Sequence, residues 1–361
     1  MKTRQFNTDC EGPISLNDNA YELSKHFIRD GDRFFTRISK YDDILADILR
    51  RPGYKAGDTL KLILPFLKAY GATNKMIEGF SAQNIILVPG AESSLKYISN
   101  KMPTFMISTS YAPYINALCD LLGFERQHIY CTEFDIDRYE IESHEINRLK
   151  EIREEIDSLP ELEFGIDVKT YDELPSLVRD ALDRLDRLFW EEILSMKSGD
   201  MLRDVNPVGG IEKANAILHS LQVTGNNLED VVYVGDSITD TDALNMVKRG
   251  GGLAVSFNGN GYAIREADIA CISSHTLILS IIADLFSREG KTGVLEFADT
   301  WSLDSIQKHG IERTLVDQLS NISPGPFPVM EVITKDNRDM LTSESEAFRK
   351  TVRGRRIGSL G

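Results

Sequence analysis

The stretch Val231–Asp240 reads VVYVGDSITD and carries the strongest fold signal of the sequence. Its first four residues are apolar, a pattern typical of a short strand that helices cover on both faces of a parallel sheet. The polar residues that follow would lie at the carboxyl end of the strand, where open α/β sheets bind ligands. Two carboxylates there, Asp236 and Asp240, suit a hard cation with oxygen ligands. The stretch predicts an α/β protein with an acidic site at one edge of its sheet.

Three further apolar runs predict strands of the same sheet, at Asn84–Val88, Thr104–Ile107 and Leu253–Val255. They alternate with segments of helical periodicity, which is typical of βαβ units. Residues 17–83 and 141–201 differ, because each reads as consecutive helices. The second stretch is rich in charged residues, which are most simply a solvated face.

The 361 residues exceed the usual size of one domain, so a core with large insertions is expected. The expected division is an α/β core of residues 1–16, 84–140 and 202–290, a helical cap of 17–83, a helical insertion of 141–201, and a C-terminal helical extension with a basic tail of 291–361. The final residues, FRKTVRGRRIGSLG, are interpreted as a mobile, solvated tail. Contact of this tail with an anionic partner is the alternative.

The composition limits the classes of function. A net charge of −15 argues against a nucleic-acid-binding surface and requires any phosphate site to be positive locally. The four cysteines form no C-x-x-C pair, and the first residues lack the apolar segment of a secretory signal. The longest apolar stretch is too short to span a membrane. We therefore expect a reduced, cytoplasmic protein that binds neither nucleic acid nor membrane.

Three separate clusters could carry chemistry. Asp9 and Glu11, followed by a glycine, could supply a nucleophile and a proton donor, although such a pair in a turn more often only solvates a loop. Ser108–Ser110 follow a predicted strand and could cradle phosphate at a helix start, or simply cap that helix. Lys213 lies in the first turn of a helix opened by Gly209-Gly210, where it would be solvated unless a phosphate lies nearby.

In this order the clusters resemble the motifs of the haloacid dehalogenase (HAD) superfamily, in its phosphoserine phosphatase-like branch. The first motif is similar to Asp9-Cys10-Glu11-Gly12, the second to Ser108, the third to Lys213 and the fourth to Gly235-Asp236-x-x-x-Asp240. The resemblance covers about residues 5–16 and 84–286. Three features depart from the family pattern: the strand before Asp9 (RQFNT) is unusually polar, Pro13 replaces the more usual Thr or Val, and the interval from Ser108 to Lys213 is long. The long interval fits an extra insertion at 141–201.

The resemblance implies a Rossmann-like core with a helical cap inserted after the first motif, and the activity of a Mg²⁺-dependent phosphohydrolase. Asp9 would attack phosphorus and form an aspartyl-phosphate. Glu11 would protonate the leaving oxygen and then activate the water that hydrolyses the intermediate. Mg²⁺ would be held by the carboxylates of Asp9 and Asp236 and by the backbone carbonyl of Glu11.

The same resemblance implies that Ser108, Thr109 and Lys213 bind the phosphoryl group. Asp240 would order metal-bound water or Lys213 without binding the metal itself. The cap would close over the site and select the substrate. Together with the negative net charge, a cap favours a small phosphorylated metabolite over a macromolecular substrate.

Two other functions stay open. A HAD-fold binding or assembly subunit without turnover would use the extra helices at 141–201 and 291–361 for self-association or for a protein partner, although the intact acidic set counts against it. A phosphotransferase with an acceptor other than water would keep the same residues. A P-loop is excluded, because Gly290-Lys291-Thr292 lacks the leading glycine and position 285 is Leu. The six histidines show no zinc-ligand spacing.

Overall fold

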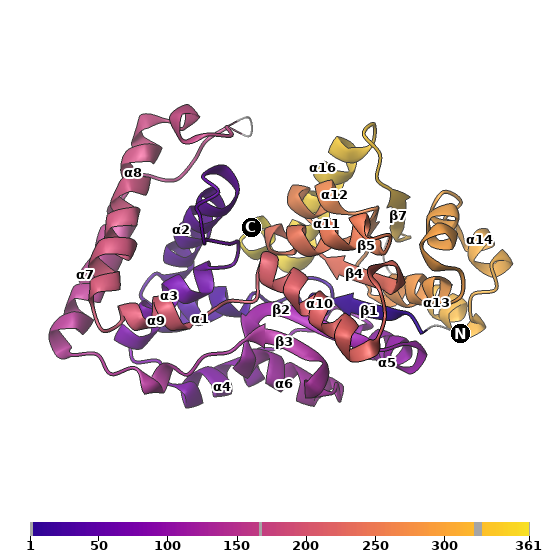
Figure 1. Cartoon of the computed structure of the whole chain (residues 1–361), viewed down its shortest axis with the longest axis horizontal. Helices are drawn as coiled ribbons and strands as arrows, with labels where there is room; N and C mark the ends of the chain where they lie inside the picture. Colours follow the sequence, from indigo (N-terminus) through magenta and orange to yellow (C-terminus); the bar gives the residue numbers. More distant parts are fainter. Residues whose placement is uncertain (1–2, 166–167, 321–326, 361) are drawn as a thin grey trace.

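The computed structural model describes residues 3–165, 168–320 and 327–360. Figure 1 shows two parts side by side, a helical domain on the left and an α/β core around a sheet on the right. The described strands form one seven-stranded sheet in the order β3-β2-β1-β4-β5-β6-β7. Their bounds are β1 (Gln5–Thr8), β2 (Thr104–Tyr111), β3 (Ile129–Thr132), β4 (Val231–Gly235), β5 (Leu253–Phe257), β6 (Ile269–Ile272) and β7 (Val329–Val332). The α/β class predicted from the sequence is confirmed.

Six strands of the sheet run parallel, and β7 joins its edge antiparallel to β6. Strand β1 lies at the centre, where Phe6 pairs with Thr104 of β2 and with Val232 of β4. Because neighbouring strands are parallel, the loops that follow β1, β2 and β4 all leave the sheet at the same edge. This places Asp9, the Ser108–Ser110 cluster and Asp236 together.

Helices cover both faces of the sheet. They are α5 (Ala91–Lys101), α6 (Ala112–Leu122), α10 (Ile211–Thr224), α11 (Thr241–Arg249), α12 (Gly261–Glu266) and α13 (Leu277–Ala298). Alternate residues of β4 point to opposite faces: Val232 and Val234 pack with α5 and α13, whereas Val231 and Tyr233 pack with α10 and α11. The apolar run in β4 is thereby explained, since neither face of the strand meets water.

The polar residues of β1 are buried and satisfied. The Gln5 side-chain amide donates to Ser220 of α10 (2.8 Å), and so does that of Asn7 (3.1 Å). Thr224 of the same helix donates to the Gln5 side-chain oxygen (2.6 Å). The unusually polar strand can therefore lie at the centre of the sheet, because hydroxyl groups of α10 pair with its buried amides. An apolar helix face would leave those amides unpaired.

Helices from the two stretches 19–83 and 143–204 build the helical domain together. Its helices are α1 (Asn19–Phe27), α2 (Gly31–Asp43), α3 (Thr59–Ala69), α4 (Asn74–Gln83), α7 (Ser143–Ser158), α8 (Ser176–Asp186) and α9 (Gly199–Asp204), with π-helical turns η1 (Ile44–Ile48) and η5 (Arg187–Ile193). Phe34, Ile38 and Tyr41 recur on one face of α2 and share a hydrophobic core with Ile152 of α7 and Phe189 of η5. The cap and the insertion expected from the sequence thus bury their apolar faces against each other.

The remaining elements connect these parts or form the C-terminal extension. Short 3₁₀ turns are η2 (Arg126–His128), η3 (Ile136–Arg138), η4 (Tyr171–Glu173), η6 (Leu228–Asp230), η7 (Ile238–Asp240) and η8 (Ile357–Ser359), and the extension holds α14 (Leu303–Lys308), α15 (Arg313–Ser320) and α16 (Arg338–Arg353). None of the described helices is both long and apolar enough to cross a membrane.

Outside the site, three local predictions differ from the structure. Asn84–Val88 is not a strand: it runs along the loop after Asp9, with Leu87 bridged only to Ser15. The extension contributes a strand, β7, which covers the sheet edge that β6 would otherwise expose. The basic tail is not solvated throughout, because Arg349 and Arg353 of α16 are buried against the core.

Candidate active site

Asp9 follows β1 and lies at the carboxyl edge of the sheet. Its backbone N–H donates to the Val234 carbonyl of β4 (2.8 Å), so strand pairing fixes the position of its side chain. Burial raises the pKa of Asp9 to about 7, against the lowering effect of Lys213, and nearby carboxylates raise it further. A cation bound beside Asp9 would favour the ionised form, which a nucleophile needs.

Lys213 supplies the positive charge beneath Asp9. It lies in the first turn of α10 and is fully buried, with its Nζ 2.7 Å from Asp9 Oδ2 and 2.7 Å from Asp240 Oδ1. Burial lowers the pKa of Lys213, but Asp240 and Asp9 more than offset this, so its pKa lies above the usual range. Lys213 is therefore a charged link between the clusters after β1 and β4.

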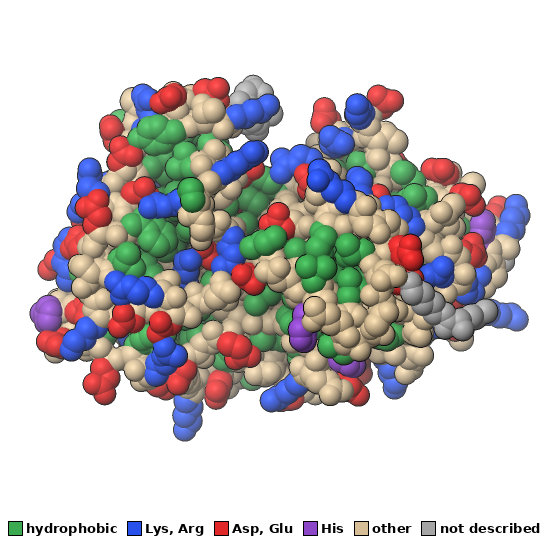
Figure 2. All heavy atoms as spheres, viewed as in Figure 1, with side chains coloured by type: hydrophobic (Ala, Val, Ile, Leu, Met, Phe, Trp, Pro, Cys, Tyr) green, Lys and Arg blue, Asp and Glu red, His purple; other side chains and the backbone are tan. Residues whose placement is uncertain are grey.

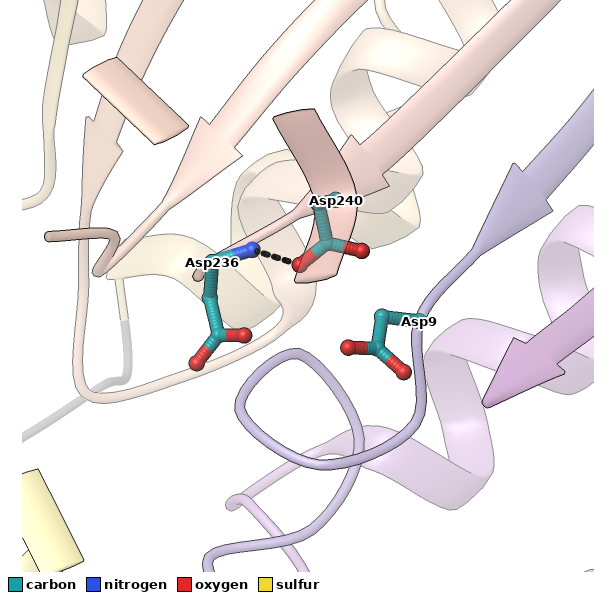
Figure 3. Close-up of side chains that lie close together, drawn as sticks. All are labelled: Asp9, Asp236 and Asp240. Atoms are coloured by element: carbon teal, nitrogen blue, oxygen red, sulfur yellow. Dashed lines mark hydrogen bonds between the residues drawn. The ribbon is translucent and has the colours of Figure 1, made fainter. Parts of the chain in front are cut away.

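Asp240 accepts five hydrogen bonds, one of them a long contact from the Ser237 hydroxyl (3.4 Å). Its Oδ1 accepts from Lys213 and from the Tyr233 hydroxyl (2.7 Å each), and its Oδ2 accepts from the backbone N–H groups of Asp236 (2.9 Å) and Ser237 (3.0 Å). Figure 3 shows the bond to Asp236. Burial raises the pKa of Asp240, but the charge of Lys213 and the hydrogen bonds to this carboxylate together hold the pKa below the usual range. This carboxylate positions Lys213 and the Asp236 loop.

Asp9 and Asp236 fit a hard cation. Oxygens of Asp9, Asp236 and Asp240 lie within 4.8 Å of one another, and Figure 3 shows the Asp9 and Asp236 carboxylates side by side. An all-oxygen set of this kind suits Mg²⁺. Because five donors already engage Asp240, Asp9 and Asp236 are the candidate ligands.

Gly12 lets the loop after Asp9 approach Asp236 closely. Its φ of +108° is a conformation that favours glycine, and a Cβ added there would lie 2.2 Å from Asp236 Oδ2. Any side chain at this position would therefore push the loop and the Asp236 carboxylate apart. The glycine in the first cluster thus has a steric role in forming the site.

Glu11 borders the same cavity as Asp9. Its Oε1 accepts the backbone N–H of Asn19 at the start of α1 (2.7 Å), so the acid is tied to the helical domain. Burial raises the pKa of Glu11 well above its usual range, and Asp18 raises it further. The raised pKa favours the protonated form of Glu11, which a proton donor needs.

Ser108 and Thr109 line the cavity but lie inside β2. The strand continues to Tyr111, with a change of register after Ile107, so the hydroxyl residues do not begin a helix as the sequence predicted. The Ser108 hydroxyl accepts the Ser110 N–H (3.2 Å), and the Thr109 hydroxyl donates to the Val208 carbonyl (3.0 Å). The irregular strand end, and not a helix N-terminus, presents these groups.

The cavity over Asp9 measures about 100 Å³ and lies between the core and the helical domain. Among its lining residues are Asp9, Glu11, Asp18, Asp42, Asp43, Ser108, Thr109, Asp236, Arg349 and Arg353. Lys213 and Asp240 reach Asp9 from the protein interior. The structure thus brings all the predicted site residues together, five on the cavity wall and two behind it.

The helical domain contacts the core beside this cavity. The Tyr111 hydroxyl at the end of β2 donates to the Leu60 carbonyl (2.5 Å), and Lys55 donates to Asn206 (2.6 Å). A Cβ on Gly209, just before α10, would lie 2.2 Å from the Ala56 carbonyl oxygen. These close approaches place the loop before α3 against the start of the Lys213 helix.

The helical domain adds two acids that the sequence did not single out. Asp42 accepts from the Tyr54 hydroxyl (2.5 Å) and the Gly57 N–H (2.8 Å). Burial raises the pKa of Asp42 to about 7 and that of Asp43 to about 8; the hydrogen bond from Tyr54 lowers the former, and the charge of Asp42 raises the latter. Both acids lie in the sequence YDD of an amphipathic helix, and adjacent acidic residues of this kind are also typical of a solvent-exposed helix face. The sequence therefore carries no signal that they line the cavity.

The sequence also did not single out two arginines at the site. Arg349 and Arg353 of α16 contact the Asp236 carboxylate, the latter at 3.1 Å. Burial lowers the pKa of Arg349, and Asp236 partly offsets this. Their spacing of four residues, which places both on one helix face, is the only signal that could have separated them from the other basic residues of the tail.

One of the solved structures that the chain resembles shares this architecture over its whole length. No protein-family model matches the chain, and no curated protein matches its sequence. The structure is similar to that of gene product AF1437 from Archaeoglobus fulgidus, with 28% identity, a TM-score of 0.79 and coverage of 99% of each chain. It also aligns with phosphoserine phosphatase in its apo form at 15% identity (TM-score 0.43, 74% of this chain and 93% of that one) and with a substrate-bound complex at 16% identity (TM-score 0.43, 75% and 93%).

The match to AF1437 spans both helical stretches and the C-terminal extension, so these belong to the shared architecture. Within the core, the four clusters that resemble HAD motifs meet at the carboxyl edge of a parallel sheet, and the helical domain begins after the first of them. The chain therefore has the haloacid dehalogenase fold.

Proposed function

We propose that this protein is a Mg²⁺-dependent phosphohydrolase that cleaves a small phosphomonoester through an aspartyl-phosphate on Asp9. The observation that carries the proposal is the position of Lys213, buried and 2.7 Å from both Asp9 and Asp240. A buried lysine there offsets the repulsion between clustered carboxylates and an incoming anion. An acidic surface loop without a phosphate substrate has no need of such a charge.

Asp9 and Glu11 divide the chemistry between them. The Asp9 carboxylate attacks phosphorus, and the bond to the leaving oxygen breaks as Glu11 donates its proton. The ionised Glu11 then takes a proton from the water that hydrolyses the aspartyl-phosphate. The raised pKa of Glu11 supports its role as the initial acid, and the Asn19 N–H holds its carboxyl group in place.

Mg²⁺ would be bound by Asp9 and Asp236, with the backbone carbonyl of Glu11 as a further ligand. The oxygen-only donor set and its spacing support this assignment. When bound, the cation neutralises charge on the phosphoryl oxygens. Asp240 holds Lys213 and the Asp236 loop in position through hydrogen bonds. Ser108 and Thr109 contribute polar atoms to the cavity wall near the phosphoryl group.

The cavity favours a small substrate. At about 100 Å³ it is well below the roughly 300–1,000 Å³ typical of pockets for drug-sized ligands. Lining residues from α2 and from the loop before α3 close it on the side of the helical domain. A small phosphorylated metabolite fits these limits better than a macromolecular substrate.

Phosphate release from a panel of phosphorylated metabolites and an aryl phosphate tests the proposal. We expect turnover that requires Mg²⁺ and is abolished in Asp9→Asn. Asp180→Asn is the matched control, because Asp180 is an exposed residue of α8 and its variant should keep full activity. Turnover that persists in Asp9→Asn, or that survives removal of divalent cations, would contradict the proposal.

A binding or assembly subunit without turnover is the second candidate. Arg349 and Arg353 favour it, since they engage Asp236 from the C-terminal extension, a region that the phosphatase chemistry itself does not need. Folded protein that binds Mg²⁺ but releases no phosphate across the panel would support this candidate. A phosphotransferase would instead show turnover that depends on an added acceptor.

A further inference from the structure

We infer that Arg349 and Arg353 compete with the divalent cation for Asp236, so that α16 is a latch which metal binding releases. This inference rests on the proposed metal site, because it takes Asp236 to be a ligand. It assigns a role to the C-terminal extension, which the proposed phosphatase chemistry leaves without one.

The contacts of the two arginines converge on one carboxylate. Arg349 Nη1 contacts Asp236 Oδ2 and also donates to the Asp236 backbone carbonyl (3.1 Å). Arg353 Nη1 lies 3.1 Å from the same Oδ2. The side chains of Arg349 and Arg353 are 3% and 5% exposed, so both charges are held in the protein interior beside Asp236. Surface pairs would not be confined in this way.

The segment around these arginines joins the core to the helical domain. On the core side, the Ser345 hydroxyl donates to the Gly259 carbonyl (2.6 Å) and Glu346 accepts the Gly261 N–H (3.1 Å). Arg353 Nε donates to the Leu16 carbonyl (3.2 Å), where the chain leaves the core for α1. Farther along, Arg356 forms an ion pair with Asp32 of α2.

The residues after Arg356 bring this segment to the cavity over Asp9. Leu360 lines the cavity over Asp9 together with Ser39 and Asp43 of the helical domain. Next to it lies a hollow whose border includes both basic and acidic side chains. They are Arg33, Arg37, Lys40, Arg355 and Arg356, and Asp32, Asp43, Glu161 and Glu163. Figure 2 shows a hollow between the two parts at the top of the view, with Lys and Arg side chains on both of its sides.

The charges around Asp236 decide whether the two arginines weaken or strengthen metal binding. A divalent cation on Asp236 would lie beside two guanidinium groups in a site shielded from water, where like charges repel strongly. If the arginines only oriented Asp236, their removal would weaken metal binding, as the loss of an orienting partner does. Asp236 is the carboxylate that both arginines contact directly, although the charge of Asp18 also acts on both of them. Because a cation on Asp236 would share that one carboxylate with the guanidinium pair, we take the repulsion to outweigh the orienting effect. Removal should therefore strengthen metal binding.

The first test compares Mg²⁺ affinity by titration calorimetry in the full-length protein and in Arg349→Met and Arg353→Met. We expect each variant to bind Mg²⁺ at least about tenfold more tightly, which corresponds to about 1.4 kcal/mol. Arg355→Met is the matched control: it removes the same charge from an exposed position on the same segment, and its affinity should match the wild type. Unchanged or weaker binding in both test variants would overturn the latch.

The second test uses the unaltered chain, in case the loss of a buried arginine prevents folding. Hydrogen exchange of the peptides that cover residues 345–360 is measured with and without Mg²⁺. Faster exchange with Mg²⁺ is expected, because the segment loses its contact with Asp236. The acceleration should disappear in Asp236→Asn.

The outcomes separate the two claims. Mg²⁺ binding to the wild-type protein without faster exchange, or with protection of residues 345–360, overturns the latch and leaves the phosphatase proposal standing. If neither the wild type nor the arginine variants bind Mg²⁺, the metal site fails, and the latch fails with it.

Discussion

Replacing Lys213 with methionine tests the charge arrangement on which the site depends. Met has a similar length but no charge, so Lys213→Met would leave Asp9 and Asp240 facing each other in the interior without the Nζ that lies 2.7 Å from each. Removal of one partner of a buried ion pair costs about 3–5 kcal/mol. We expect a loss of this size in the free energy of unfolding at pH 8, in buffer free of divalent cations.

The loss should depend on pH with a defined sign. Without Lys213, burial raises the pKa values of Asp9 and Asp240 in the folded protein above those of the unfolded chain. The folded state then holds protons that the unfolded state releases, so stability is present at low pH and falls as pH rises. Each carboxyl group changes the free energy by about 1.4 kcal/mol per pH unit in that range. The variant should be closer to the wild type at pH 5 than at pH 8.

Urea unfolding followed by circular dichroism at pH 5 and pH 8 provides the measurement. Lys75→Met is the control, since Lys75 is exposed on α4 and its replacement should change stability by less than about 0.5 kcal/mol. A loss below about 1 kcal/mol for Lys213→Met at pH 8, or a larger loss at pH 5 than at pH 8, would refute this account of the buried network.

Two further variants test other parts of the structure. Gly12→Ala places a Cβ 2.2 Å from Asp236 Oδ2 and should abolish phosphate release. The control Gly53→Ala, with nothing within 4 Å of its Cβ, should keep phosphate release. Retained activity in Gly12→Ala would show that the loop after Asp9 is not constrained by Asp236. Burial raises the pKa of Asp43 to about 8, so its carboxyl group favours folding at low pH and loses this contribution as pH rises toward 8. Asp43→Asn should therefore raise the melting temperature relative to wild type more at pH 8 than at pH 5, and an equal shift at both values would mean that Asp43 titrates normally.

The sequence identified the core strands β2, β4 and β5, because their identity depends on local pattern, but it did not single out β3 or β6. The run before Asp236 is apolar throughout, and in the structure both of its faces are covered. Parallel order then brings together residues as distant as Asp9, Ser108, Lys213 and Asp240. The strand predicted at Asn84–Val88 is wrong, because a continuous apolar run is also typical of a segment that packs along a loop without joining the sheet.

The C-terminal arginines could not be predicted because their environment is set by distant chain segments. In FRKTVRGRR, charge density alone indicates a solvated tail. Burial of Arg349 depends on Asp236, which lies 113 residues earlier in the chain. The two helical stretches pose the same difficulty, since neither reveals that Arg37 of α2 pairs with Glu161 (2.8 Å) or that Arg153 of α7 pairs with Asp30 (3.1 Å).

The claim that Asp9 is the nucleophile can be tested by identifying the covalent intermediate. The protein would be quenched during turnover of a phosphomonoester and treated with borohydride, which reduces an aspartyl-phosphate to homoserine, and the peptides would be analysed by mass spectrometry. The account predicts homoserine at position 9 and at no other aspartate. Turnover that leaves position 9 unmodified, with the phosphoryl group on another residue, would contradict it.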